Sequence, residues 1–510
     1  MNIKQSLLLA GRNLLDCLSP DHGYLPNWRL RVNPDYTAQF SFSWPGHNIG
    51  RWWDAMLRIE RATGFVIPAD LEGAMLRNTY AFFDNPDHLC FEPRSEARPN
   101  RSVELHSLRE GLMALIALIR WRGSAWAREK GHRMLVTIAA ISGDNGTWEL
   151  EKLDYFHACG GNKFYKFFDP CSSNGRLIEA LVWFYEATGD GLALELAERF
   201  ARYHYQYTTQ EDGRINLSSD ASHAHSYLGT LRGLVLYGAL TGQRHYVDRV
   251  AKTFHVGLPR IFRPSGFNAH DLLTEGFGET SSPGDAAQLG LWLGLQGYGE
   301  CFDEAERLVR CRLLPSQIVD SPPLRGLESD ADVNLNAKII GGYGGCHDEP
   351  HSGRMNVTDV TCAVAHSLAD IYEHIVRHSA LDMRVLFHLD YTDERIDVRS
   401  ERGGEGQLTV VPKVDRAVWI RVPRWTPAAS VRLFIDGMPA EPQYAGDCIV
   451  IEKPGVGTIL RLSYALPERR TTEEINGKTY TIAWKGDAIA GVSPHVDFYS
   501  FYPPLREENR

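Results

Sequence analysis

Hydrophobic residues recur with helical spacing from the start of the chain to about residue 378, which is the pattern of amphipathic helices. Three of these patterns end in Thr-Gly, a signal for a helix that stops on a left-handed glycine. They cover residues 56–64, 181–189 and 234–242, and the last two are followed by further amphipathic stretches at 193–200 and 246–251. The spacing of this helix–turn–helix unit is irregular, which favours a closed toroid of helix pairs over a regular solenoid.

Near residue 383 the hydrophobic pattern changes to short strand-like runs. They lie at 384–389, 407–411, 417–422, 431–435, 448–451 and 458–462, with turn signals such as Asp436-Gly437 and Pro454-Gly455 between them. Several short strands with this spacing are typical of an antiparallel sandwich. We therefore predict a mainly α protein with β structure: an (α/α)6-type helical toroid over residues 1–380, followed by an antiparallel β-sandwich domain over 381–510.

Composition and charge limit the classes of function. A chain of 510 residues is long enough for two or three domains. Its net charge of -10 argues against a nucleic-acid partner, which requires basic surfaces. Aromatic residues make up 11% of the chain; their faces suit sugar rings, although aromatic side chains also fill protein cores.

The sequence carries no strong signal for secretion or for a membrane. No stretch is long and apolar enough to span a bilayer, so we expect no membrane partner. The short apolar run at the N-terminus is interrupted by Arg12-Asn13 and indicates an amphipathic first helix better than a signal peptide. Nine scattered cysteines without a CxxC pattern are typical of reduced thiols. We therefore predict a cytoplasmic protein.

An acidic, glycine-rich segment just before a helix offers the clearest candidate chemistry. Residues 274–285 hold three carboxylates, Glu275, Glu279 and Asp285. Glycosidic cleavage needs a pair of carboxyl groups, one of which donates a proton to the leaving oxygen, and the glycines allow the backbone to approach a ligand closely. The alternative is a solvated acidic loop in which Asp285 caps the following helix.

Histidines and aromatic residues gather at other predicted helix starts. Trp44, His47 and Asp54 lie in one such segment, His106 shares a helical face with Glu110 at i+4, and His223 and His225 open the helix that ends at residue 242. Each could contact a substrate, or could instead cap a helix or lie satisfied in the core. His223 and His225 are spaced i, i+2, which argues against a two-histidine metal site on one helical face.

A second glycine-rich stretch, residues 341–353, contains potential metal donors. Cys346, His347 and His351 lie in it and Cys362 follows, but their spacing matches no standard zinc finger or HExxH pattern. Asp359 is well placed to cap the next helix. Zinc is a minority interpretation here, and we expect no cofactor.

Several segments, taken in order, resemble the β-L-arabinofuranosidase-type glycoside hydrolases, family 127 and its relatives, over about residues 40–470. They are Ser173-Asn174-Gly175-Arg176, His223-Ala224-His225, Glu275-Gly276-Phe277-Gly278, Glu279-Thr280-Ser281, the segment from Ala305-Glu306-Arg307 to Leu314-Pro315-Ser316-Gln317, and Ile420-Arg421-Val422-Pro423-Arg424-Trp425. The resemblance implies an (α/α) toroid with β-sandwich domains and a retaining mechanism. It also implies a zinc-bound cysteine nucleophile, with the metal held by one Glu and three Cys.

Within this resemblance the family's general acid falls on Glu275 and its zinc glutamate on Glu279, but the cysteines differ. Ser281 stands where one zinc cysteine is expected. The expected cysteine pair falls between Thr358-Asp359 and Thr361-Cys362, so at most one of its thiols remains. We therefore predict a carboxylate mechanism in which Glu275 or Glu279 is paired with Asp359.

The sequence as a whole predicts a glycoside hydrolase that removes a terminal sugar from an oligosaccharide or glycoside. The catalytic candidates are Glu275, Glu279 and Asp359, and the predicted substrate-binding residues are Trp44, His47, Asp54, His106, Asn174, His223 and His225. Two alternatives stay open: a polysaccharide lyase or unsaturated-uronide hydrolase that uses the histidines, and a non-catalytic sugar-binding relative. The expected partner is a carbohydrate, and the edge strands of the sandwich could pair two copies of the chain.

Overall fold

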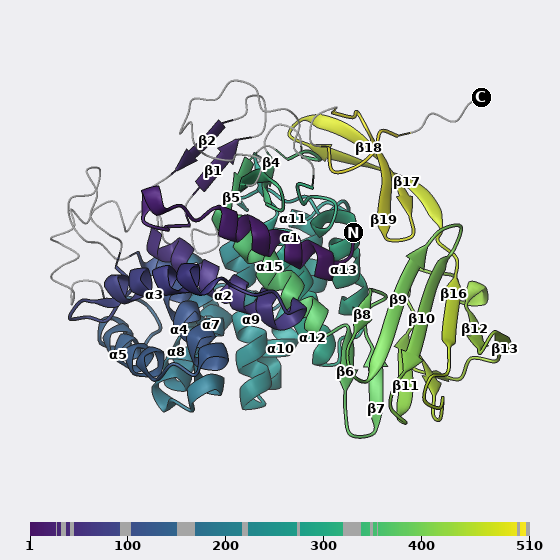
Figure 1. Cartoon of the computed structure of the whole chain (residues 1–510), viewed down its shortest axis with the longest axis horizontal. Helices are drawn as coiled ribbons and strands as arrows, with labels where there is room; N and C mark the ends of the chain where they lie inside the picture. Colours follow the sequence, from purple (N-terminus) through teal and green to yellow (C-terminus); the bar gives the residue numbers. More distant parts are fainter. Residues whose placement is uncertain are drawn as a thin grey trace.

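The protein is described here from a computed structural model. It covers residues 1–26, 28–31, 37–40, 45–91, 104–149, 169–216, 223–272, 276–319, 338–346, 350–353, 355–496 and 500–505. A helical part is followed by a part made of strands, which lie side by side in Figure 1. The change between them falls between Glu373 and Val376.

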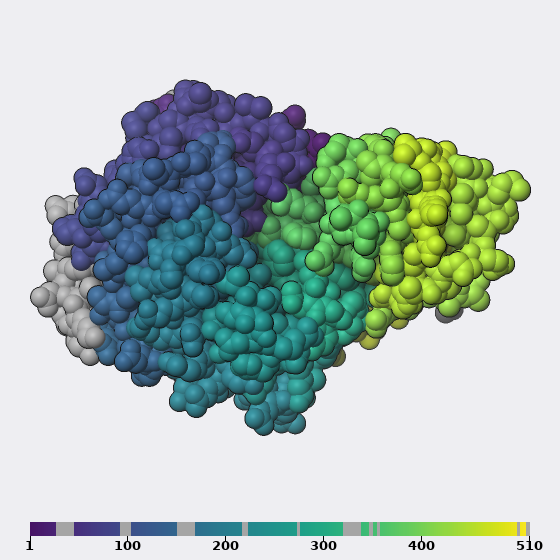
Figure 2. Space-filling model, turned by 90° about the horizontal axis from the view of Figure 1, so that it is seen from below, coloured from purple at the N-terminus to yellow at the C-terminus, as the bar shows by residue number. Residues whose placement is uncertain are grey.

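Six helices form a closed inner ring. They are α2 (Pro45–Thr63), α4 (Leu108–Arg122), α7 (Arg176–Thr188), α9 (Ala224–Thr241), α12 (Ser281–Leu295) and α15 (Thr358–Glu373). Each packs against the next, and α15 packs against α2. Seen from below, the colours of the chain follow one another round this body before reaching the strands (Figure 2).

Within the described residues, six further helices cover the outside of the ring. They are α1 (Ile3–Asp16), α3 (Ala69–Phe83), α5 (Ala125–Ile141), α8 (Gly191–Tyr207), α10 (Arg244–Val256) and α13 (Cys301–Leu308). Inner helices such as α9 bury most of their length, whereas outer helices such as α10 bury one face, as expected for two concentric layers. The predicted (α/α)6-type toroid is confirmed.

Local sequence signals explain where several of these helices stop. Gly64, Gly189 and Gly242 have positive φ angles of 76°, 73° and 70°, so each predicted Thr-Gly end is a left-handed glycine. Gly50 has a different role, because a Cβ atom there would lie 2.2 Å from the carbonyl oxygen of Glu110. It therefore allows α2 and α4 to approach closely.

The strands after α15 form a sandwich of two sheets. One sheet has the order β13 (Met438–Ala440), β12 (Arg432–Ile435), β16 (Leu460–Tyr464), β10 (Gly406–Pro412), β9 (Ile396–Arg402), β8 (Tyr391–Thr392). The other has the order β14 (Tyr444–Ala445), β15 (Cys448–Ile451), β11 (Ala417–Arg421), β7 (Asp382–Val385), β6 (Val376–His378). Alternate residues of β10 are buried, as a strand packed on one face requires.

Two features of the strand region differ from the prediction. The pair β7–β11 is parallel within an otherwise antiparallel sandwich, because β8, β9 and β10 of the other sheet lie between these two strands in the chain. The last strands, β17 (Glu468–Ile475), β18 (Lys478–Lys485) and β19 (Ala488–Ser493), form a separate sheet. It packs on the helical part through Tyr480 and Trp484 against Phe267 and Cys311.

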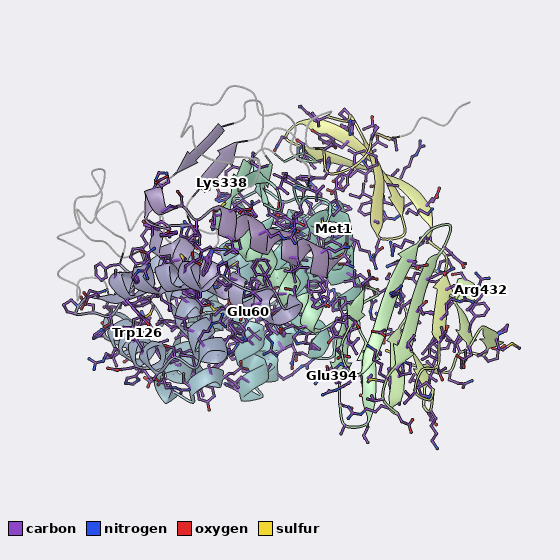
Figure 3. The ribbon with its side chains drawn as sticks, viewed as in Figure 1. Met1, Glu60, Trp126, Lys338, Glu394 and Arg432 are labelled. Atoms are coloured by element: carbon purple, nitrogen blue, oxygen red, sulfur yellow. The ribbon has the colours of Figure 1, made fainter. Side chains whose placement is uncertain are left out.

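The two parts are joined by buried polar contacts. Arg421 of β11 pairs with Asp303 and Glu306 of α13. At the N-terminus, Asn2 donates to Asp390 at 3.0 Å, and Figure 3 shows Met1 on the side of the helical part that faces the strands. Among the described helices, none has the length and hydropathy that a membrane span needs.

A small antiparallel sheet lies at one end of the toroid, above the helices in Figure 1. Its order is β2 (Thr37–Phe40), β1 (Trp28–Arg31), β5 (Met355–Val357), β4 (Gly344–Cys346), β3 (Gly278–Glu279). Because β3 leads into α12 and β5 into α15, this sheet fixes the starts of two inner helices.

Candidate active site

Inner and outer helices alternate along the chain, so the inner helices run in one direction and begin at the same end of the ring. The predicted site residues gather there. His47 lies in the first turn of α2, His106 in a short helix (Leu105–Ser107) before α4, His223 at the N-cap of α9, Glu279 on β3 before α12, and Asp359 in the first turn of α15. We call these residues, together with His270, the mouth of the toroid.

Four imidazoles form a continuous row across the mouth. His47 and His106 stack with ring centroids 5.2 Å apart and an angle of 8° between the planes. His106 lies 6.2 Å from His223, and His223 stacks on His270 at 4.3 Å. The sequence did not point to His270, which reaches the row because the chain at 223 and 271 forms an isolated β-bridge.

Glu279 lies at one end of this row. Its carboxylate oxygens are 3.9 Å from Nε2 of His223 and 3.5 Å from Nε2 of His270, and Ser281 donates a hydrogen bond to it at 3.2 Å. Burial alone would raise the pKa of Glu279, but His223, His270 and Ser281 together lower it to about 2. Glu279 is therefore ionised at neutral pH, which suits a base, nucleophile or ligand better than a proton donor.

Asp359 lies beside the opposite end of the row. Its carboxylate is 4.0 Å from Nε2 of His47, and its side chain is 25% exposed. Its backbone carbonyl accepts a 3.5 Å hydrogen bond from Arg51. Glu279 is 22% exposed, so both carboxylates can be reached from solvent.

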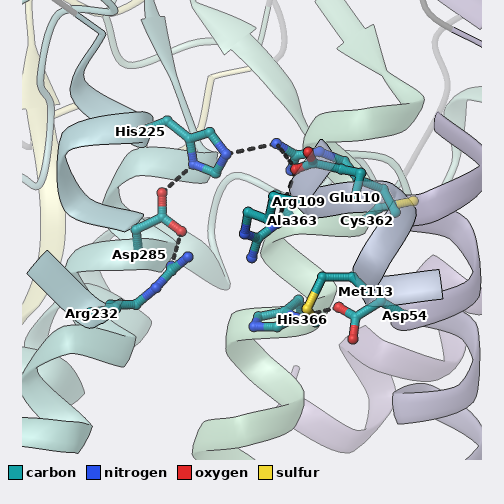
Figure 4. Close-up of a pocket in the computed structure, with 11 residues that line it drawn as sticks. Asp54, Arg109, Glu110, Met113, His225, Arg232, Asp285, Cys362, Ala363 and His366 are labelled. Atoms are coloured by element: carbon teal, nitrogen blue, oxygen red, sulfur yellow. Dashed lines mark hydrogen bonds and ion pairs between the residues drawn. The ribbon is translucent and has the colours of Figure 1, made fainter. Parts of the chain in front are cut away.

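Below the mouth, the inner helices carry a buried network of arginines and carboxylates. We call it the inner network, and its members are Arg51, Arg109, Glu110, Arg176, Glu179, His225, Arg232 and Asp285. Figure 4 shows Asp285 between His225 and Arg232. The cavity between these side chains has a volume of about 10 Å³, which is roughly enough for one water molecule. A sugar must therefore bind above this network.

Arg51 connects the mouth to the inner network. Its Nε donates to Nε2 of His47 at 2.8 Å, and its Nη2 lies 2.7 Å from Nε2 of His225. Burial, followed by neighbouring arginines, lowers the pKa of His225 well below its usual value, and burial likewise lowers the pKa of His47 although Glu110 opposes it. The pKa of His106 is also lowered, by burial and then by Arg176. All three imidazoles are therefore neutral at neutral pH.

The remaining predicted residues are placed elsewhere. Asp54 lies deeper in the ring, where it pairs with Arg58 and His366, and these partners outweigh burial and hold its pKa below the usual range. Asn174 is buried in a π-helical turn (Cys171–Gly175) and donates to the carbonyl of Gly146, so it braces a loop. Trp44 and Glu275 lie outside the described residues.

The thiolate zinc set implied by the family resemblance does not fit this site. Ser281 offers a hydroxyl in place of a thiol, and this hydroxyl is bonded to Glu279. Cys362 is buried beside the inner network, and burial raises the pKa of its thiol well above the usual value. Three thiolates cannot be assembled from the matching positions.

Arg51 and Arg176 were not among the predicted site residues. Arg51 could have been found, because it lies i+4 from His47 on the same face of α2. Arg176 stands in a recognised motif, and its Nη1 lies 2.6 Å from Nε2 of His106, a contact that the sequence does not reveal.

No model of a known protein family matches the sequence, and no curated protein matches it. Solved structures do match. A GH127 β-L-arabinofuranosidase from Geobacillus stearothermophilus T6 aligns with a TM-score of 0.56 and 13% identity, over 87% of this chain and 76% of that one. Another GH127 β-arabinofuranosidase aligns with a TM-score of 0.61 and 13% identity, over 94% and 78%. This likeness confirms the predicted resemblance at the level of the fold.

Proposed function

We propose that this protein is a glycoside hydrolase that acts at the mouth of the toroid. One observation carries the proposal: two solvent-accessible carboxylates, Glu279 and Asp359, border a row of imidazoles above a filled inner network. Hydrolysis of a glycosidic bond needs two carboxyl groups with different roles. The fold shared with GH127 glycosidases supports the same class of reaction.

We further propose that the enzyme is exo-acting and removes a terminal sugar. The inner network closes the toroid below the mouth, so a chain of sugars cannot pass through it. Glu279 remains ionised, which leaves the proton donor to Asp359 or to Glu275, the sequence-based candidate. Neutral His47 and His106, which belong to the mouth, are suited to hydrogen-bond hydroxyl groups of the sugar.

A panel of nitrophenyl glycosides, with pentofuranosides and hexopyranosides of both anomers, tests this proposal. We expect Glu275→Gln or Glu279→Gln to abolish turnover while the melting temperature stays nearly unchanged. Asp248→Asn, on the exposed surface of α10, is the control and should keep full activity. Retained turnover in both glutamate variants would overturn the carboxylate mechanism.

A second candidate, a polysaccharide lyase or unsaturated-uronide hydrolase, is supported by the neutral imidazoles of His47 and His106. A neutral imidazole can abstract a proton from a uronic acid. A rise in ultraviolet absorbance on incubation with uronic acid polymers would indicate a lyase. Calorimetric binding without turnover of any glycoside would instead favour a non-catalytic sugar-binding protein.

We propose a cytoplasmic location and a carbohydrate partner. Cys17, Cys301, Cys311, Cys362 and Cys448 are free thiols, and scattered thiols of this kind are typical of a reducing compartment. Pairing of sandwich edge strands between two copies is a further proposal, and size-exclusion chromatography with light scattering tests it.

A further inference from the structure

Three side chains at one end of the mouth converge as metal ligands do. The ligand atoms of His223, His270 and Glu279 all lie within 4.8 Å of one another. We propose that these residues hold a divalent transition-metal ion such as Zn²⁺ through two imidazole nitrogens and one carboxylate oxygen. This ligand set contains no cysteine and shares only Glu279 with the thiolate set that the family resemblance implies.

The distances fit two ligands of one ion better than direct pairs. His223 Nε2 is 3.9 Å from Glu279, too far for a hydrogen bond, and this buried nitrogen has no hydrogen-bond partner in the described part of the chain. His270 Nε2 is 3.5 Å from the other oxygen of Glu279. Ligands about 2.0–2.2 Å from a tetrahedral zinc ion are roughly 3.3–3.5 Å apart, so small side-chain movements suffice.

Each imidazole is also oriented by a contact at its second ring nitrogen, as metal-binding histidines usually are. Nδ1 of His223 lies 2.9 Å from the hydroxyl of Ser226, and Nδ1 of His270 lies 3.0 Å from the carboxylate of Asp271. These contacts occupy Nδ1 in both rings and direct Nε2 towards Glu279. The Asp271–His270 pair is a carboxylate–histidine arrangement of the kind that raises ligand basicity.

The backbone holds the three ligands in place before any ion binds. Ala224 N–H donates to the carbonyl of His270 at 2.9 Å, and His270 N–H donates to the carbonyl of Phe277 at 2.8 Å. Glu279 is paired with Gly345 across β3 and β4. The ligands therefore come from three segments that hydrogen bonds tie together, which lowers the entropic cost of assembling the site.

The surface of the outer helices offers a matched comparison. His255, Glu300 and Cys301 also lie within 4.8 Å of one another. There, His255 Nε2 is 3.2 Å from Glu300, an ordinary hydrogen-bonding distance, and the His255 side chain is 42% exposed. Burial raises the pKa of the Cys301 thiol, which keeps it protonated. This cluster is a hydrogen-bonded pair beside a thiol and provides the control.

The metal site also affects the proposed reaction, and only this catalytic consequence rests on the proposed function. If Glu279 binds an ion, it is not free to donate or accept a proton. The carboxylate pair of the reaction would then be Glu275 and Asp359. Three protein ligands would also leave a tetrahedral zinc ion one open position, which could take a water molecule or a sugar oxygen.

The test measures Zn²⁺ binding to the full-length protein, independently of turnover. After treatment with a chelator, the protein is dialysed against Zn²⁺ and its metal content is measured by atomic emission. We expect about one Zn²⁺ per chain, and a rise in melting temperature on adding Zn²⁺. Circular dichroism and the melting temperature of the metal-free form verify that each variant folds.

Variants locate the ion. His223→Ala, His270→Ala and Glu279→Gln should each lose the stoichiometric Zn²⁺ and its thermal shift, whereas His255→Ala should keep both. Asp271→Ala should weaken Zn²⁺ binding by about 10–100-fold, because it removes only the group that orients His270. A merely structural role for Asp271 would leave the affinity unchanged.

The proposal is overturned if the wild-type protein binds no stoichiometric Zn²⁺, if the three ligand variants keep it, or if His255→Ala loses it. Failure of the proposed function is a separate result. Zn²⁺ binding without turnover of any glycoside would support the metal site and contradict the hydrolase, and turnover by a protein that binds no Zn²⁺ would do the reverse.

Discussion

The mouth and the inner network are built by the same ring of helices, yet their polar residues are arranged differently. In the inner network, Glu179 accepts hydrogen bonds of 2.9 Å from both Nε and Nη2 of Arg232, and it also pairs with Arg109. In the mouth, Glu279 and Asp359 lie 3.5–4.0 Å from their nearest imidazole nitrogens and remain partly exposed. The carboxylates of the network therefore pair with arginines at hydrogen-bonding distance, whereas those of the mouth lie farther from their imidazole neighbours.

This difference separates structural from functional polar residues. A buried ion pair with its hydrogen bonds made is costly to break, because removing one partner leaves an unpaired buried charge. Polar groups held slightly too far apart to bond gain little from one another and can receive a ligand instead. Substitutions in the mouth should therefore affect activity, and those in the network should affect stability.

The largest expected effect is the loss of activity in Asp359→Asn. The change removes the charge but keeps Oδ1, which accepts a hydrogen bond from Val360 N–H at 2.9 Å, so the fold should persist. We expect glycoside turnover to fall by about 10²–10⁴-fold, the usual contribution of a positioned acid or base. Rates on the best aryl glycoside of the panel and thermal melting measure both quantities. A large drop in melting temperature with normal activity would show that Asp359 stabilises the fold and does not take part in the reaction.

The next largest effect is a loss of stability in Glu179→Gln. This change leaves Arg109 and Arg232 without their shared charge partner, which should lower the free energy of unfolding by about 3–5 kcal/mol. Glu186→Gln on the same helix is the matched control. Glu186 is 44% exposed where it pairs with Arg120, and its loss should cost at most about 1 kcal/mol. Equal effects in chemical denaturation would show that the network does not stabilise the ring.

A smaller loss of stability is expected from Gly50→Ala. The new Cβ would overlap the carbonyl of Glu110 and push α2 away from α4, with a cost of about 1–3 kcal/mol. Gly191→Ala is the control, because a Cβ at this position of α8 meets nothing within 4 Å. That change should stabilise the protein by up to about 1 kcal/mol. Thermal melting of both variants compares them, and similar melting points would argue against close contact of the inner helices.

Much of the architecture could be predicted because its signals are local. The Thr-Gly ends at Gly64, Gly189 and Gly242 and the change to strand-like runs near residue 383 can be found within short windows of sequence. The toroid in turn explains why His47 and Asp359, far apart in the chain, come to one end of the ring. Both residues were predicted to lie at helix starts, and all inner helices of a toroid start at the same end.

The parts that could not be predicted depend on contacts between distant segments. His270 joins the mouth through a backbone bridge to the start of α9, and its own surroundings carry no periodic signal. The alternation of Tyr480, Ile482 and Trp484 is typical of a strand, but only the structure shows that this strand packs on Phe267 of the helical part. Arg176 likewise reaches His106 and Glu110 across helices.

The last effect is confined to acidic pH and concerns a buried histidine outside both regions, where burial acts without a charged partner. His204 of α8 contacts the hydroxyl of Thr208 at 2.7 Å, and burial alone lowers its pKa to about 3. In the unfolded chain a histidine has a pKa of about 6.5. The unfolded state therefore binds the proton first, and the free energy of unfolding falls as the pH drops below about 6.5, until it levels off near the folded pKa.

His204→Gln removes this titration. Between pH 6 and pH 4 the wild-type protein should lose up to about 1.4 kcal/mol more stability per pH unit than the variant. Denaturant unfolding at half-unit pH intervals measures the two slopes, so any constant cost of the substitution cancels. Parallel slopes would mean that His204 does not remain neutral in the folded state. The same measurement on Glu179→Gln then shows whether acid sensitivity comes from burial of a neutral imidazole or from the charges of the inner network.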